Sequence, residues 1–455
     1  MRRGKRSSAS RVNGQLRVEF GDDRLTSHAG LEILQRRLHV LEFSQRLRTA
    51  FSRLPFVGDY SVVEMVRLFL TMMLVGARRL GHVRFLSRDP MVLRMAGLAV
   101  LPSDRTLSRW LARFTGKSLR QLGIVSLDLV CRSVRQLKLR VLTLDVDGSV
   151  ISTGMRVQWA QRGYNPHHRK VPSYYPILVH LAETGQVLWL KNRPGNVHDA
   201  KNADRLLREI VGLLRTRLPR RARLRFRMDG AFFQRSVLQM LHMLGVDYAI
   251  KVPMHSWLGL KSLIQMRVRW EPVTDTVSGF ETTLRIKPWD MTVRIVCYRK
   301  KVFHQTAKNF QLDLFNPDDG TYEYSAVTTS LSFTVKNLWL FMAGRGAQEK
   351  TIAELKTGLA FDSIPSKRYA ANSAWQWLSV LTHNLHRDLQ ISVRSGSARR
   401  TRKATYAYAF ATIQTSRFEW LNVAGRLLSL AQGATLRLPS SPDIESCFRT
   451  RFRAA

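Results

Sequence analysis

Acidic residues are scarce in this chain of 455 residues, in which 33 Asp and Glu stand against 73 Lys and Arg for a formal net charge of +40. Such a balance is self-repelling unless a polyanion is present, and it disfavours an acidic or neutral partner. Nucleic acid is therefore the expected partner. Basic charge alone does not separate an enzyme from an architectural protein, but a chain of this length with 45% hydrophobic residues can bury several cores.

Cysteine is also rare. The chain has three cysteines, at Cys131, Cys297 and Cys447. Their odd number and wide spacing exclude a disulfide framework and a Cys-x-x-Cys zinc site. We therefore expect a protein of a reducing, intracellular compartment.

Long hydrophobic runs are missing. The most apolar segment, Val62–Val75, is interrupted by Glu64 and Arg67 and is too short to span a membrane. Its apolar residues instead recur at spacings of three and four, which is typical of an amphipathic core helix. We expect no membrane association.

Residues 1–137 show helical periodicity and are predicted to form a helical N-terminal DNA-binding domain. Asp89 and Pro90 predict the start of one short helix and Gly97 its end, and Ser103 is placed to cap a second helix. These two helices form a candidate helix-turn-helix.

On the second of these helices, Arg105, Arg109 and Arg113 recur every four residues, opposite an apolar face. This pattern suits contact with DNA in the major groove or along its phosphates. It is equally typical of arginines on a solvated surface.

The periodicity changes in residues 138–254, where short alternating segments rich in β-formers predict strands. Predicted strands cover residues 141–147, 177–181, 187–190, 224–228 and 248–252, and predicted helices cover 199–214 and 235–244. The order βββαβαβ matches an RNase H-like α/β core.

The remaining sequence predicts an interruption of that core. Residues 255–334 form a β-rich insertion, and residues 335–393 return to the core as helix, including the helix that carries Glu349. Residues 394–455 are predicted to be a basic linker followed by a C-terminal helical tail.

Two acids lie at the ends of predicted core strands: Asp147 is the last residue of the first strand, and Asp229 directly follows the fourth. Together with Glu349 they give three carboxylates that we expect to converge at the strand ends. Mg²⁺ prefers oxygen ligands, and two such ions can activate a nucleophile and stabilise a leaving oxygen. Asp145 points to the same strand face as Asp147, and we assign it an auxiliary role beside the metal.

Arg345, Glu349 and Lys356 lie at spacings of four and seven residues, which place an acid between two bases on one helical face. Taken singly, each acid has an ordinary alternative. Asp147 and Asp229 both precede glycine and fit simple turns, and Glu349 fits a surface ion pair. Only the combination in this order of elements favours a catalytic site.

These motifs make the chain similar to insertion-sequence transposases of the DDE class, in the group marked by a Tyr-x2-Arg-x3-Glu-x6-Lys signature. The resemblance covers nearly the whole chain. It rests on residues 144–149 (LDVDGS), residues 226–233 (FRMDGAFF), and Arg345, Glu349 and Lys356. The signature tyrosine is replaced by Met342, so any contact that the tyrosine would make with the DNA end is absent.

The resemblance implies a DNA transposase that binds terminal inverted repeats and performs metal-dependent strand cleavage and strand transfer. Asp147, Asp229 and Glu349 would be the catalytic metal ligands for Mg²⁺ or Mn²⁺, with two ions expected. Arg345 and Lys356 would approach the DNA phosphates, with Arg105 and Arg109 as further DNA-binding residues.

The same resemblance implies double-stranded DNA as partner, both terminal repeats and target, and a homodimer on paired ends. It implies a bacterial cytoplasmic location, on DNA. Two alternatives remain open: an RNase H-like DNA nuclease without strand transfer, and a catalytically silent DNA-binding protein derived from a transposase.

Overall fold

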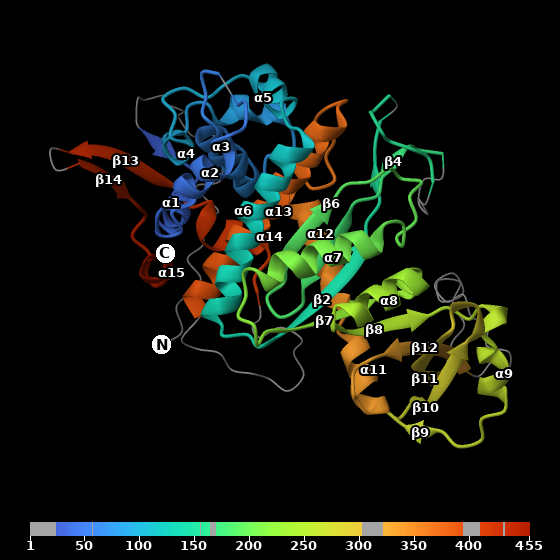
Figure 1. Cartoon of the computed structure of the whole chain (residues 1–455). Helices are drawn as coiled ribbons and strands as arrows, with labels where there is room; N and C mark the ends of the chain where they lie inside the picture. The colour runs from blue at the N-terminus through green and yellow to red at the C-terminus, as the bar shows by residue number, and fades with distance from the viewer. Residues whose placement is uncertain are drawn as a thin grey trace, which may run out of the picture.

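The computed structural model describes residues 24–56, 58–154, 156–163, 170–302, 322–394, 410–430 and 433–455. The N-terminal part is helical (Figure 1). Its helices are α1 (Leu31–Val40), α2 (Phe43–Phe51), α3 (Val62–Val75), the 3-10 helix η2 (Leu80–Leu86), α4 (Pro90–Ala96), α5 (Asp104–Leu111) and α6 (Gly116–Gln136).

The predicted caps are present in this helical region. Asp89 accepts hydrogen bonds from the backbone at the start of α4, which ends at Gly97 in a left-handed conformation. Ser103 caps α5 through the backbone nitrogen of Thr106. Both helices begin at a capping side chain and α4 also ends at a glycine, so both starts and the end of α4 could be predicted from sequence. Helix α3 has the bounds expected for the apolar segment, and most of its side chains are buried.

The core is a mixed sheet, which has nine strands among the described residues. Its first five strands lie in the order β6-β5-β2-β7-β8. The bounds are β2 (Val141–Gly148), β5 (Ile177–Leu181), β6 (Gln186–Lys191), β7 (Arg223–Met228) and β8 (Asp247–Val252), with α7 (Ala203–Arg215) and α8 (Arg235–Met243) between them in sequence. Strand β2 pairs antiparallel with β5 and parallel with β7. The predicted βββαβαβ order is confirmed, and the mixed sheet is consistent with an RNase H-like core.

The β-rich segment extends this sheet. Its strands are β9 (Glu271–Pro272), β10 (Val277–Ile286), β11 (Met291–Lys301) and β12 (Tyr322–Thr329), and the short helix α9 (Leu260–Gln265) precedes them. Strand β12 pairs antiparallel with β8, so backbone hydrogen bonds join the insertion directly to the core. Figure 1 shows these strands at the side of the molecule away from the N-terminal helices.

The returning segment is not one continuous helix through Glu349. It consists of α11 (Val335–Ala343), α12 (Gly346–Leu359) and α13 (Tyr369–Arg394), and the chain bends at Gly344 and Arg345. At the bend the backbone hydrogen bonds are of the tighter i+3 kind, as from Gln348 to Arg345. Glycines on both sides of Arg345 weaken the helix here, so Arg345 lies at the start of α12 rather than in a helix interior.

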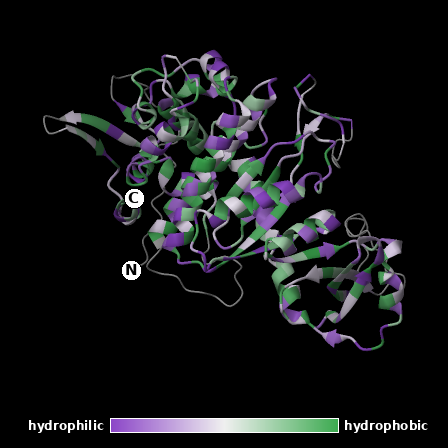
Figure 2. Ribbon diagram, in the orientation of Figure 1, coloured by the Kyte–Doolittle hydropathy of each residue, from purple (hydrophilic) through white to green (hydrophobic). Residues whose placement is uncertain are grey.

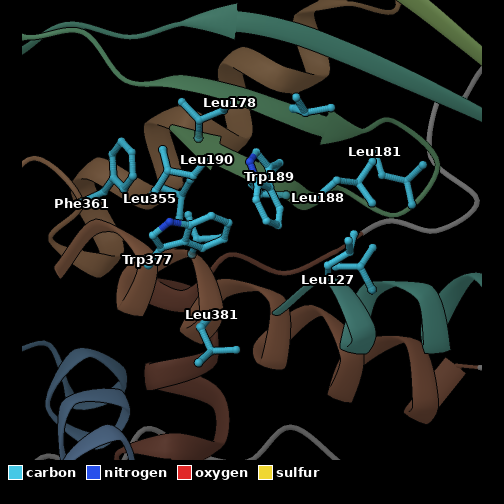
Figure 3. Packing of buried hydrophobic residues seen from close by; sticks show 14 of the residues in the cluster. Leu127, Leu178, Leu181, Leu188, Trp189, Leu190, Leu355, Phe361, Trp377 and Leu381 are labelled. Atoms are coloured by element: carbon cyan, nitrogen blue, oxygen red, sulfur yellow. The ribbon is translucent and has the colours of Figure 1, made fainter. Parts of the chain in front are cut away.

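A continuous hydrophobic cluster joins the N-terminal helices to the sheet. Figure 3 shows Trp189 and Leu188 of β6 facing Trp377 of α13 and Leu127 of α6, with Leu355 of α12 beside them. The Trp189 and Trp377 rings meet edge to face with centroids 5.3 Å apart. In Figure 2, α6 and α7 alternate between hydrophobic and hydrophilic segments, as amphipathic helices on a core do.

The C-terminal segment is only partly helical. It contains α14 (Ile413–Ser416), a π-helical turn (Arg417–Leu421) and α15 (Pro442–Ala454), but also a hairpin of β13 (Gly425–Leu430) and β14 (Gly433–Arg437). Strand β1 (Leu25–Thr26) pairs with β13. The expected helical tail is therefore wrong for this hairpin, because edge pairing with a strand from the other end of the chain stabilises an extended conformation that local sequence does not reveal. The predicted basic linker falls mainly on residues 395–409, outside the described residues.

Two further expectations concern the described part of the chain. None of its helices is both long and apolar enough to cross a membrane. The three cysteines are free, and burial raises the thiol pKa of Cys131 and Cys297 to about 12.

Candidate active site

Asp147 and Asp229 lie side by side at the edge of the core sheet. Strands β2 and β7 run parallel, and their register pairs Val146 with Met228. Asp147 follows Val146 and Asp229 follows Met228, so both acids lie at the same end of the two parallel strands. This register brings the two acids to neighbouring positions, as the sequence predicted, although 82 residues separate them.

Arg345 bridges the two carboxylates. Its Nη2 atom lies 2.8 Å from Oδ2 of Asp147 and 3.7 Å from Oδ2 of Asp229. The three side chains are 15%, 20% and 29% exposed for Arg345, Asp147 and Asp229 respectively. Among the residues that the structure describes, the buried Nε of Arg345 has no hydrogen-bond partner. The guanidinium thus satisfies the acids with one edge and keeps an unused donor.

The site carries more negative charge than Arg345 neutralises. Burial raises the pKa of Asp147 to about 7, opposed by Arg345 and reinforced by the charges of Asp229 and Asp199. Burial also raises the pKa of Asp229, again opposed by Arg345 and reinforced by Asp199. Carboxylates in this condition favour a bound cation.

Asp199 is an acid of this site that the sequence analysis missed. Its side chain is held by the Tyr175 hydroxyl at 2.6 Å and by Nη2 of Arg193 at 2.9 Å. It also lies against the end of β2, because a Cβ built on Gly148 would come within 2.5 Å of the Asp199 carboxylate. A glycine is therefore required at position 148. Local sequence gave no signal for Asp199, because its place is set by Tyr175 and Arg193 in the folded chain.

Glu349 and Lys356 lie further along α12. Glu349 is exposed in the first turn of the helix. Lys356 donates from Nζ to the carbonyl of Val150, in the segment that follows β2, at 2.9 Å. Burial lowers the pKa of Lys356. Since Arg345 and Lys356 both contact the end of β2 or the residues after it, the helical face that they share with Glu349 is turned toward this edge.

The structure does not assemble the three proposed ligands into one group. In the described ranges, no three His, Cys, Asp or Glu side chains are grouped so that they could hold a metal ion. Asp147 and Asp229 are brought together, and Glu349 stays in solvent. The other acid of α12 that could have been chosen, Glu354, is buried in an ion pair with Arg387 at 2.7 Å and serves packing instead.

Asp145 lies one pleat deeper in β2 and does not reach the site. It is fully buried and accepts two hydrogen bonds from Arg227, at 2.6 Å from Nε and 2.9 Å from Nη2. Nδ1 of His180 lies 3.4 Å from the same carboxylate. Arg227 on the neighbouring strand satisfies both oxygens of Asp145, and the auxiliary role assigned to this acid stays a prediction.

Arg105 and Arg109 are exposed on α5, as their spacing predicted, while Leu107 and Leu111 are buried on the other side. Met342, at the signature tyrosine position, packs against a second hydrophobic cluster between α11 and strands β11 and β12. Position 342 therefore contributes to packing in this chain.

The residues at the sheet edge fit a divalent cation. Asp147 and Asp229 supply hard oxygen ligands of the kind that Mg²⁺ and Mn²⁺ prefer. The guanidinium of Arg345 already stands between them as a positive charge.

The raised pKa of Asp147 predicts how metal-free stability depends on pH. The folded protein holds this proton up to about pH 7, whereas an unfolded chain loses it near pH 4, so stability should fall as the pH rises through that window. Asp147→Asn should remove this fall and make the metal-free protein more stable than wild type at pH 8, by on the order of a few kcal/mol.

Thermal melting between pH 4 and pH 8 in the presence of a chelator measures this effect. Asp275→Asn, at an exposed acid in the turn between β9 and β10, is the matched control and should keep the wild-type profile. An Asp147→Asn profile identical to that of wild type would contradict the argument.

Comparison with known proteins gives the family. Residues 9–454 match the family model described as transposase DDE domain group 1. Among solved structures, the chain resembles the cryo-EM structure of the piggyBac transposase synaptic complex with hairpin DNA, with 10% sequence identity and a TM-score of 0.45, over 85% of this chain and 78% of that one. No curated protein matches the chain at a significant level. Because the family model spans nearly the whole sequence, this chain belongs to the DDE transposases, group 1.

Proposed function

We propose that this protein is a DNA transposase that cleaves DNA at terminal inverted repeats and joins the freed ends to target DNA. The observation that carries the proposal is the pair of carboxylates, Asp147 and Asp229, aligned at the ends of parallel strands with Arg345 between them. Membership of the DDE family agrees with this chemistry. The intact carboxylate pair argues against a catalytically silent relative.

Asp147 and Asp229 would hold Mg²⁺ or Mn²⁺, with Glu349 as the third ligand. Bound metal would supply Lewis-acid activation of the attacking oxygen and stabilisation of the leaving oxygen. Glu349 is exposed one turn along α12 from Arg345 and shares its helical face.

Arg345 would have two roles. In the free protein it pairs with both aspartates and offsets part of their mutual repulsion. Toward the scissile phosphate, the guanidinium would donate from Nη2 and from Nε, which is buried without an acceptor among the described residues, while Asp147 and Asp229 would hold the metal. A planar guanidinium suits such bidentate binding of phosphate.

The function is tested with purified protein, Mg²⁺ and a plasmid that carries the DNA flanking the coding region. Cleavage at the ends of inverted repeats, followed by insertion of the excised segment into a second plasmid, is the expected result. Cleavage at the ends without joined products would favour the nuclease instead. Absence of any cut in Mg²⁺ or Mn²⁺, with DNA binding intact, would reject the catalytic proposal.

Replacing Arg345 should separate metal binding from catalysis. Because the guanidinium competes with metal for the same carboxylates, Arg345→Ala should bind Mn²⁺ more tightly than wild type. Single-turnover cleavage at saturating DNA should nevertheless fall by about tenfold to a hundredfold, the equivalent of one charge-assisted hydrogen bond. The affinity for Mn²⁺ is measured from the rise in melting temperature as Mn²⁺ is added.

Arg285 gives the matched control for that experiment. It lies on β10 in the β-rich insertion, outside the carboxylate site, and its side chain is 72% exposed and pairs with Asp290. Arg285→Ala should change neither Mn²⁺ binding nor cleavage. If Arg345→Ala weakens Mn²⁺ binding, Arg345 supports the metal site and does not compete with the ion.

A further inference from the structure

A hollow on the described part of the molecule lies outside the carboxylate site, where η2 and α5 of the N-terminal helices meet the loop that follows α12. Its volume is about 910 Å³. Its polar lining comes from Arg78, Arg79, His82, Asp104, Arg105 and Ser108, with Ser363 on the loop side. We call it the basic cleft. Its lining contains three arginines and a histidine but a single carboxylate, so the basic cleft is complementary to a polyanion.

The arginines of the basic cleft differ in what they already bind. Arg78 donates to the carbonyl oxygens of Lys356 and Thr357, at 2.9 and 3.0 Å, and pairs with Asp362 at 2.7 Å. The side chains of Arg79 and Arg105 are exposed. In the described part of the chain neither has an acidic partner, so two guanidinium groups in the basic cleft are available to an anion.

The Arg78 contacts tie the basic cleft to the catalytic helix. Arg78 holds the last turn of α12, and Lys356 in that turn reaches Val150, three residues after Asp147. The basic cleft is therefore joined through the last turn of α12 to the segment that follows the catalytic strand β2.

We propose that the basic cleft binds the phosphate backbone of duplex DNA away from the reacting phosphate, with Arg79 and Arg105 as its phosphate contacts. This inference rests on the proposed function for the position of the DNA. It gives Arg105 a phosphate contact rather than a base contact and leaves Arg109, on the next turn of α5, as the residue placed to read base edges. Arg78 lines the basic cleft and also binds the last turn of α12, so it would link bound DNA to the helix that carries Glu349.

The test measures how binding of a duplex oligonucleotide of arbitrary sequence depends on salt. Each lost phosphate contact should reduce the slope of log K against log salt by about one, because one fewer counterion is released. Arg79→Ala and Arg105→Ala should each show this reduction, and the double variant a reduction of about two. Arg79→Lys keeps the charge and should keep the wild-type slope.

The matched control is Arg205→Ala with Arg208→Ala on α7, which removes the same charge from exposed positions that do not line the basic cleft. The proposal is overturned if the Arg79 and Arg105 double variant keeps the wild-type slope, or if the α7 control loses as much. Wild-type cleavage in Mg²⁺ judges the proposed function separately. Reduced slopes without any cleavage keep the basic cleft and reject the transposase chemistry, whereas normal cleavage with unchanged slopes does the reverse.

Discussion

Asp229→Ala should abolish DNA cleavage while leaving DNA binding and folding almost unchanged. Removal of one carboxylate takes away a ligand for the expected metal and leaves Asp147 alone with Arg345, which neutralises it fully. Losses at residues that act as a unit in catalysis are large, and we expect a fall of about a thousandfold or more in single-turnover rate. Salt-dependent DNA binding should survive, because its phosphate contacts come from basic residues elsewhere.

Asp229→Asn is the sharper version of this test, since it keeps the acceptor oxygen that caps the turn after β7 through the backbone nitrogen of Ala231, at 3.1 Å. It should fold like wild type and still not cut. The matched control is Asp247→Asn, which replaces a partly exposed acid at the start of β8. A variant at Asp229 that cleaves at the wild-type rate would remove this residue from the site.

Asp145→Ala should behave in the opposite way and lower the stability of the fold. Asp145 is fully buried, and its removal leaves the Arg227 guanidinium buried without its two charge-assisted hydrogen bonds. Breaking a buried ion pair by removing one partner costs about 3–5 kcal/mol. Thermal and urea unfolding should therefore show a large loss, whereas Asp147→Ala in the same assay should show little loss or a gain above pH 7.

Replacing both Asp145 and Arg227 distinguishes the stability lost to an unpaired buried charge from the stability lost to a cavity. Asp145→Leu combined with Arg227→Met removes the unpaired charge, so it should recover part of the stability lost in Asp145→Ala. Cleavage at a temperature where both proteins are folded should survive in Asp145→Ala if Asp145 acts only through the fold. Complete loss of cleavage with unchanged unfolding would return Asp145 to the metal site.

Local sequence determined most of the regular elements of this protein. Strand periodicity predicted β5 at its observed bounds and β7 and β8 to within one residue. Capping residues fixed the starts of α4 and α5, and Gly97 fixed the end of α4, because these residues act through the nearest backbone groups. The side-by-side position of Asp147 and Asp229 also followed from sequence, because strand order and parallel direction alone set the register at that edge.

Only the tertiary structure decided which acids are free to act. Asp145 and Asp147 are two residues apart on one strand, and nothing local separates them. Their roles diverge because Arg227 comes from the adjacent strand to cover the first, while the second reaches the sheet edge. Asp199 joins the site through contacts with Tyr175 and Arg193 that depend on the folded chain.

Long-range pairing likewise decided the features that periodicity missed. The hairpin of β13 and β14 is held by the pairing of its own two strands, and β1, about 400 residues earlier in the sequence, adds an edge partner. Glu349 was identified by its spacing from Arg345 and Lys356, but its distance from the two aspartates is set by the bend at Gly344 and by the packing of α12. Sequence therefore determined the residues and the elements that carry them, and the three-dimensional packing determined which side chains meet, because charge and burial act between neighbours in space.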